Sequence, residues 1–178
     1  MTIEQYNNRT IKDNGFTIIE ALVAIFVLTV GIVGCMTLAN QVLRTSEISK
    51  DRLIAVNLAQ EGIEVIRNIR DTNWLVGTGN WNDNIISDCN GSSLNKQVAY
   101  NSTSTEAYAD SYLKLDSNGY YNYTSGNDTT FKRKLTVQCL EFPEAGQYKK
   151  MLVEARVYWT SRGTSKEILM TEHLYDWK

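Results

Sequence analysis

The sequence predicts an α+β protein in which one long N-terminal helix packs on an antiparallel β-sheet near the C-terminus. Three observations support this fold class. Residues 16–43 are apolar apart from Glu20, and residues 44–71 repeat apolar side chains at helical spacing without a proline. The last third of the chain alternates apolar with polar residues, which is typical of strands that cover a core on one face.

The average composition hides this division. The chain of 178 residues is 43% hydrophobic and 21% charged, with a net charge of −2, as in an ordinary soluble domain. These values argue against a strongly basic nucleic-acid binder and against a charge-dominated disordered chain. They do not show that the apolar residues gather near one end.

The apolar segment predicts a membrane span. As a helix, residues 16–43 would be about 42 Å long, against a hydrocarbon core of about 30 Å. The segment is longer than the apolar region of a secretory signal peptide, and no A-x-A-like cleavage site follows it. Residues 1–15 are polar, show no apolar periodicity and are typical of a leader. A buried helix of a soluble domain is the alternative for the apolar segment.

Glu20 needs a positive partner if it lies in a membrane. A carboxylate near the start of an apolar span costs about 2–3 kcal/mol unless it is neutralised. The nearest downstream basic residue is Arg44, about six helical turns away. Cleavage after Gly15 would create an ammonium group on Phe16, about one turn from Glu20. Alternatively, Glu20 simply occupies the N-terminal end of the helix, where the helix dipole favours an acid.

The string KDNGFTIIEALVAIFVLTVGIVG resembles the N-terminal signature of type IV pilins and of the pseudopilins of type II secretion systems. That signature has a polar leader ending in glycine, then phenylalanine, a small or hydroxyl residue, two aliphatic residues, glutamate and a long apolar helix. The matching residues are Gly15, Phe16, Thr17, Ile18, Ile19 and Glu20. Gly31 and Gly34 make the string more similar to minor pilins than to a major fibre subunit.

The resemblance implies a processing and assembly sequence. Prepilin peptidase would cut between Gly15 and Phe16 and methylate the Phe16 amine. An assembly ATPase and a membrane platform protein would move the subunit from the bilayer into a filament of pilin subunits. In the filament, Glu20 would pair with the Phe16 amine of a neighbouring subunit and set the register.

We therefore expect a structural subunit without enzymatic activity, cofactor or metal. Its residues 16–43 would lie in the bacterial cytoplasmic membrane and later in the filament core. Its residues 72–178 would form an extracytoplasmic, β-rich head, exposed in a cell-surface or periplasmic filament. The alternative is a permanently anchored extracytoplasmic binding or adhesion domain that does not polymerise. A pilus, a secretion pseudopilus and a DNA-uptake fibre all fit the same signature.

One position departs from the pattern of many major pilins. They carry a helix-breaking proline some twenty residues into the mature chain, where this chain has Thr37, and its only proline is Pro143. Gly31 and Gly34 would either loosen the helix in place of the proline or let neighbouring helices pack closely.

Residues 44–71 predict an amphipathic continuation of the same helix. The apolar face consists of Ala55, Ala59, Gly62, Ile66 and Ile69, broadened by Val56, Leu58 and Ile63. Charged residues occupy the rest of the surface. The alternative is a break near residues 44–48 that would give two helices.

The head predicts short strands followed by longer ones. Asn118-Gly119 predicts a hairpin turn between residues 112–115 and 120–123. The many tyrosines of this region would either pack one face of a small sheet or form an adhesive or sugar-binding surface.

Three longer strands are expected in the last third of the chain. They are predicted at residues 135–139, 151–159 and 166–177, and Gly163 lies in the last turn.

The three cysteines fall in different surroundings. Cys35 lies within the apolar segment and should behave as a small hydrophobic residue. Cys89 and Cys139 lie in the head and either form one disulfide or remain thiols. A disulfide closing a loop of about 50 residues would add roughly 3–4 kcal/mol of stability.

No catalytic or metal-binding motif stands out in the sequence. His173 is the only histidine, and a lone histidine is weak evidence for a metal site or a catalytic triad. Four loop aspartates, Asp83, Asp88, Asp116 and Asp128, lack the spacing of an EF-hand. An anchored hydrolase would need a pocket with at least two convergent acids.

Overall fold

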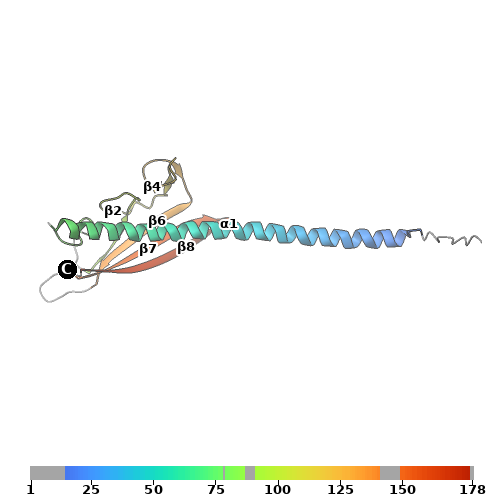
Figure 1. Cartoon of the computed structure of the whole chain (residues 1–178), viewed down its shortest axis with the longest axis horizontal. Coiled ribbons are helices and arrows are strands. Elements are labelled where there is room, and N and C mark those ends of the chain that lie inside the picture. The colour runs from blue at the N-terminus through green and yellow to red at the C-terminus, as the bar shows by residue number, and fades with distance from the viewer. Residues whose placement is uncertain (1–14, 78, 87–90, 141–148, 177–178) are drawn as a thin grey trace, which may run out of the picture. The chain divides into compact units, whose positions relative to one another are not determined.

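The computed structural model describes residues 15–77, 79–86, 91–140 and 149–176 (Figure 1). Within these residues, one helix is followed by eight strands, which confirms the predicted α+β class. The elements are α1 (Ile18–Val76), β1 (Ser93–Gln97), β2 (Glu106–Ala107), β3 (Lys114–Leu115), β4 (Tyr121–Asn122), β5 (Asn127–Asp128), β6 (Phe131–Cys139), β7 (Lys150–Ser161) and β8 (Thr164–Tyr175).

Helix α1 is continuous, so the alternative of two helices broken near residues 44–48 is wrong. Thr37, which stands where many major pilins have proline, lies inside the helix and donates its hydroxyl to the Val33 carbonyl at 2.9 Å. The helix extends five residues beyond the predicted end at Asp71. It stops where Gly77 adopts a positive φ of 68° and donates its N–H to the Asn73 carbonyl, as in a left-handed C-cap.

The chain divides into two units at Ser46 and Glu47. In the first unit, all described residues, 15–46, are exposed. The second unit contains the later part of α1 and all the strands, and it holds the hydrophobic core.

The main sheet of the second unit is antiparallel, with the strand order β2-β1-β6-β7-β8, and a small sheet has the order β4-β3-β5. The predicted hairpin is confirmed: β3 pairs with β4, and Gly119 adopts a φ of 86° in the turn between them. The turn between β7 and β8 contains Arg162 and Gly163, with φ values of 52° and 75°. Two consecutive positive φ angles match the right-handed twist of the flanking strands.

The three long C-terminal strands are confirmed, with different ends. Strand β6 begins at Phe131, four residues before the predicted start, because buried Phe131 and Arg133 continue its alternation. A charged residue in a buried position concealed this part of the pattern. Strand β8 runs from Thr164 to Tyr175, whereas the predicted end at Trp177 lies outside the described residues.

One face of α1 packs against the sheet. The face expected from the sequence is buried, except that Val56 is only half-buried and Val65 is buried in addition. A Cβ atom placed on Gly62 would lie 3.0 Å from Leu135 Cδ2 and 3.1 Å from Arg133 Cδ. At Gly62 the side chains of β6 thus fill the space that a Cβ atom would need, and the missing side chain allows this close approach.

Arg133 is completely buried in this interface. Its Nη1 donates to the Leu58 carbonyl at 2.9 Å and to Glu61 Oε1 at 2.7 Å, and its Nη2 donates to the Val98 carbonyl at 2.6 Å. The three acceptors belong to α1 and to the residue that follows β1. One guanidinium group thus joins the helix to two neighbouring segments of the sheet.

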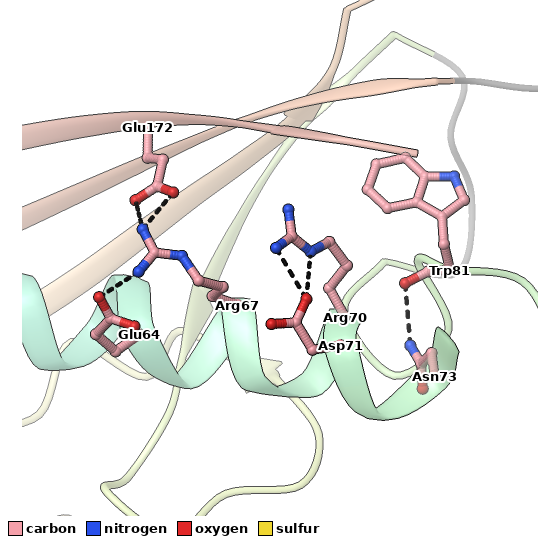
Figure 2. Close-up of polar contacts among 7 residues, drawn as sticks. All are labelled: Glu64, Arg67, Arg70, Asp71, Asn73, Trp81 and Glu172. Atoms are coloured by element: carbon pink, nitrogen blue, oxygen red, sulfur yellow. Dashed lines mark hydrogen bonds and ion pairs between the residues drawn. The ribbon is translucent and has the colours of Figure 1, made fainter. Parts of the chain in front are cut away.

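A second set of polar contacts fastens the end of α1 (Figure 2). Arg67 Nη2 donates to both carboxylate oxygens of Glu172 on β8, at 2.5 and 2.6 Å, and Nη1 donates to Glu64. The bond to Glu172 is the main reason that the pKa of Arg67 is raised. Six residues further along α1, Asn73 Nδ2 donates to the Trp81 carbonyl at 3.1 Å, which holds the chain after α1 against the helix (Figure 2).

We predict that Arg133→Ala lowers the free energy of unfolding of the head by about 3–5 kcal/mol, because it leaves a cavity and buried acceptors without a donor. The measurement is urea denaturation of the full chain in detergent micelles, followed by tryptophan fluorescence. Arg156→Ala is the matched control, since Arg156 on β7 forms a partly exposed ion pair with Glu167 at 2.9 Å. It should cost about 1 kcal/mol or less. Equal losses in the two variants would contradict the role of Arg133.

Candidate processing and assembly site

The first turn of α1 is built by Thr17 and Glu20. The Glu20 N–H lies 3.3 Å from Thr17 Oγ1 and 3.1 Å from the Thr17 carbonyl oxygen, and the helix begins at Ile18. Thr17 is therefore the N-cap residue, and Glu20 is the third residue of the helix. This is the Thr-x-x-Glu spacing of a capping box. Gly15 and Phe16 stand just before the helix and are exposed.

The position of Glu20 is compatible with both roles expected from the sequence. It is the acidic residue of the first turn, where the helix dipole favours a carboxylate. Among the described residues, Glu20 forms no ion pair in the uncleaved chain. An ammonium group on Phe16 exists only after cleavage, and it would then lie two residues before the start of the helix.

After its first turn, α1 exposes apolar side chains on every side. Phe16, Ile18 and Val30 are 74%, 83% and 57% exposed, and the most apolar part of α1 buries none of its residues. Within the described part of the chain, α1 is the one helix whose length and composition allow it to cross a membrane. A helix that is hydrophobic on every side requires lipid or other helices around it.

Residues 11–36 match the family model described as the prokaryotic N-terminal methylation motif. The chain carries the type IV pilin and pseudopilin signature. The signature marks a structural, non-enzymatic family, and the matched residues start within the predicted leader and end inside the apolar part of α1. A search of curated proteins and a search of solved structures found no match to this chain.

The structure brings the predicted processing residues together at one end of α1. Gly15, Phe16 and Glu20 fall within the six residues that surround the helix start, whereas most of the predicted leader, residues 1–14, lies outside the described residues. The sequence reasoning missed the capping role of Thr17. The spacing of Thr17 and Glu20 before an apolar run was the signal that could have revealed it.

The other candidate residues occupy ordinary structural positions. His173 is exposed on β8, beside Tyr175. Asp83 and Asp116 accept hydrogen bonds from main-chain N–H groups of nearby turns, and Asp128 pairs with Lys114 at 3.6 Å. The fourth loop aspartate, Asp88, lies outside the described residues. In the parts of the chain that the structure describes, no group of three or more His, Cys, Asp or Glu side chains is arranged to hold a metal ion.

The structure describes two of the three cysteines, Cys35 and Cys139. Cys35 is a free, exposed thiol on α1, and Cys139 is buried at the end of β6. Cys89 lies outside the described residues, so the pairing of Cys89 with Cys139 stays a prediction. Gln138 Nε2 donates to the Gly91 carbonyl at 3.0 Å, which places the chain two residues after Cys89 beside the strand that ends at Cys139.

We predict that non-reducing peptide mass spectrometry of the purified chain finds Cys89 joined to Cys139. Cys139→Ser should lower the free energy of unfolding by about 3 kcal/mol, since the unfolded chain regains the entropy of a loop of about 50 residues. Cys35→Ser is the control and should leave the stability of the head unchanged. Alkylation of both Cys89 and Cys139 without a reductant would rule out the disulfide.

Proposed function

We propose that the chain is a minor pilin or pseudopilin, a structural subunit of a type IV pilus-like or type II secretion filament. The observation that carries this proposal is the methylation motif placed at the exposed start of an apolar helix. The motif by itself supports a type IV pilin-like or pseudopilin subunit. The architecture of a long helix followed by an antiparallel sheet is consistent with it.

Processing is the first step of the proposal. Prepilin peptidase cuts between Gly15 and Phe16 and methylates the new amine. Both residues are exposed and precede the first helical residue, Ile18, so no helical hydrogen bond has to break before the chain enters a protease site. Cleavage moves a positive charge to within about one helical turn of Glu20.

Assembly is the second step. A platform protein, driven indirectly by an assembly ATPase, withdraws the helix from the cytoplasmic membrane into a filament. Leaving lipid is tolerable only if the apolar surface enters another apolar bundle, such as a core of like helices. Gly31 and Gly34 leave open space on the helix, since an added Cβ atom would meet nothing within 4 Å, and neighbouring helices would pack closely there.

The ion pair between subunits sets the register of the filament. A carboxylate in an apolar core is acceptable only when it is paired, and the Phe16 amine of a neighbouring subunit is the partner that we propose for Glu20. The head, residues 72–178, then lies outside the cytoplasmic membrane and on the surface of the filament. The assembled chain would be found in a cell-surface or periplasmic filament.

The first test is the mass of the mature N-terminus. In protein purified from membranes of cells that contain prepilin peptidase, we expect a chain that starts at N-methylated Phe16. Gly15→Leu should block cleavage, because the peptidase site then meets a bulky residue at the scissile bond. Recovery of the intact N-terminus from the unaltered chain would refute the proposal.

The second test concerns Glu20. Glu20→Ala should still insert in the membrane and fold its head, but it should enter filaments at least about tenfold less, as judged by immunoblots of sheared filaments. Glu47→Ala is the control, because Glu47 is an exposed acid of the same helix that pairs only at the surface with Arg162. Unchanged localisation and activity of Glu20→Ala would favour the permanently anchored binding domain instead.

A further inference from the structure

A groove of about 370 Å³ lies on the outer face of the main sheet. Arg133 on β6 points toward α1, so its neighbours Lys132 and Lys134 point to the opposite face. The side chains that matter most for the groove are Tyr108, Asp110, Tyr112, Lys132, Lys134 and Tyr158. They come from β6, β7 and the segment between β2 and β3.

Aromatic rings and ammonium groups alternate in this groove. Lys132 Nζ lies 4.6 Å from the centre of the Tyr112 ring, and Lys134 Nζ lies 5.9 Å from the centre of the Tyr158 ring. Tyr112 remains 49% exposed, so its ring offers a free surface to a ligand. Each lysine lies over one face of its ring and helps to orient it.

A carboxylate is held among these groups. Asp110 Oδ1 accepts hydrogen bonds from the Tyr108 hydroxyl at 2.8 Å and from Lys132 Nζ at 3.1 Å. The bond from Tyr108 and then that from Lys132 lower the pKa of Asp110, so the carboxylate is ionised at neutral pH. Asp110 adopts a φ of 52°, in the left-handed region that aspartate tolerates better than most residues other than glycine.

We propose that this groove binds an acidic saccharide, in which the sugar units carry a carboxylate. A sugar ring has an apolar face of C–H groups that can pack on the exposed ring of Tyr112 and on Tyr158. Its hydroxyls find acceptors and donors in Asp110 and in the hydroxyls of Tyr108 and Tyr158. The sugar carboxylate would pair with Lys134, which forms no ion pair among the described residues.

The charges of the groove favour this class of ligand over a neutral sugar. Two lysines against one aspartate leave one positive charge, which matches one carboxylate. A single-stranded nucleic acid also stacks on aromatic side chains, but its phosphates stand apart from its bases, whereas the carboxylate of an acidic sugar is attached to the ring that stacks, as the position of Lys134 beside the Tyr158 ring favours.

The experiment measures binding to the full chain in detergent micelles by isothermal titration calorimetry. The probes are trigalacturonate, neutral maltotriose and a ten-nucleotide oligothymidylate. We expect trigalacturonate to bind at least about tenfold more tightly than either of the others. Lys134→Gln and Tyr112→Ala should each weaken its binding about tenfold, whereas Tyr112→Phe, which keeps the ring, should bind like the unaltered chain.

The sheet offers a matched control outside the groove. Lys150 Nζ lies 5.6 Å from the centre of the Tyr175 ring, a lysine–tyrosine pair of the same kind in the same sheet. Lys150→Gln and Tyr175→Ala should leave the affinity for trigalacturonate within about twofold. All variants should keep the thermal midpoint of the unaltered chain.

Three results would overturn the proposal. The first is no binding of trigalacturonate at 10 mM, and the second is tighter binding of the oligothymidylate, which would indicate a nucleic-acid site. The third is an affinity that the groove variants and the control variants change equally. The saccharide proposal does not depend on filament assembly. The N-terminal mass tests the proposed function and the binding measurements test the groove, so either proposal can be refuted without the other.

Discussion

The head depends on a charge that has no access to water. The guanidinium of Arg133 lies at the centre of the contact between α1 and the sheet, and it is tolerated there because two main-chain carbonyls and one carboxylate accept its hydrogen bonds. Such bonds are directional, unlike apolar contacts, so they specify one rotation and one depth of the helix on β6. Gly62 makes that depth accessible, since any side chain at this position would compete with Arg133 and Leu135 for space.

The long elements were predictable because each repeats one pattern many times. The apolar half of α1, its buried face and the strands β7 and β8 all follow from periodicity. The start of β6 was missed because a charged residue occupies a core position, and the end of α1 was missed because its last turn is held by tertiary contacts. Asn73 and Trp81 illustrate the second case, since the hydrogen bond between them forms only once the chain has turned back.

The two candidate sites differ in how they could be found. Gly15, Phe16 and Glu20 are close in sequence, so a local motif reveals them and the structure adds mainly the N-cap at Thr17. The groove draws on residues from three separate segments, and no spacing in the sequence links Asp110 to Lys134 or Tyr158. The tyrosines suggested a surface of some kind, but only the pairing of β6 with β7 brings Lys132 opposite Tyr158.

The order of elements along the chain also limits when the head can close. The buried face of α1 is made early in synthesis, but the groups that cover it come much later: Arg133 is 75 residues beyond Leu58, and Glu172 is 105 residues beyond Arg67. Contacts between residues so distant in sequence form slowly and late. If the N-terminal end of the chain is exported first, the helix emerges with an apolar stripe that stays uncovered until the C-terminal strands follow. A membrane tether on the same helix would keep that incomplete intermediate dispersed in the plane of the bilayer, away from the aggregation that exposed apolar surface promotes in solution.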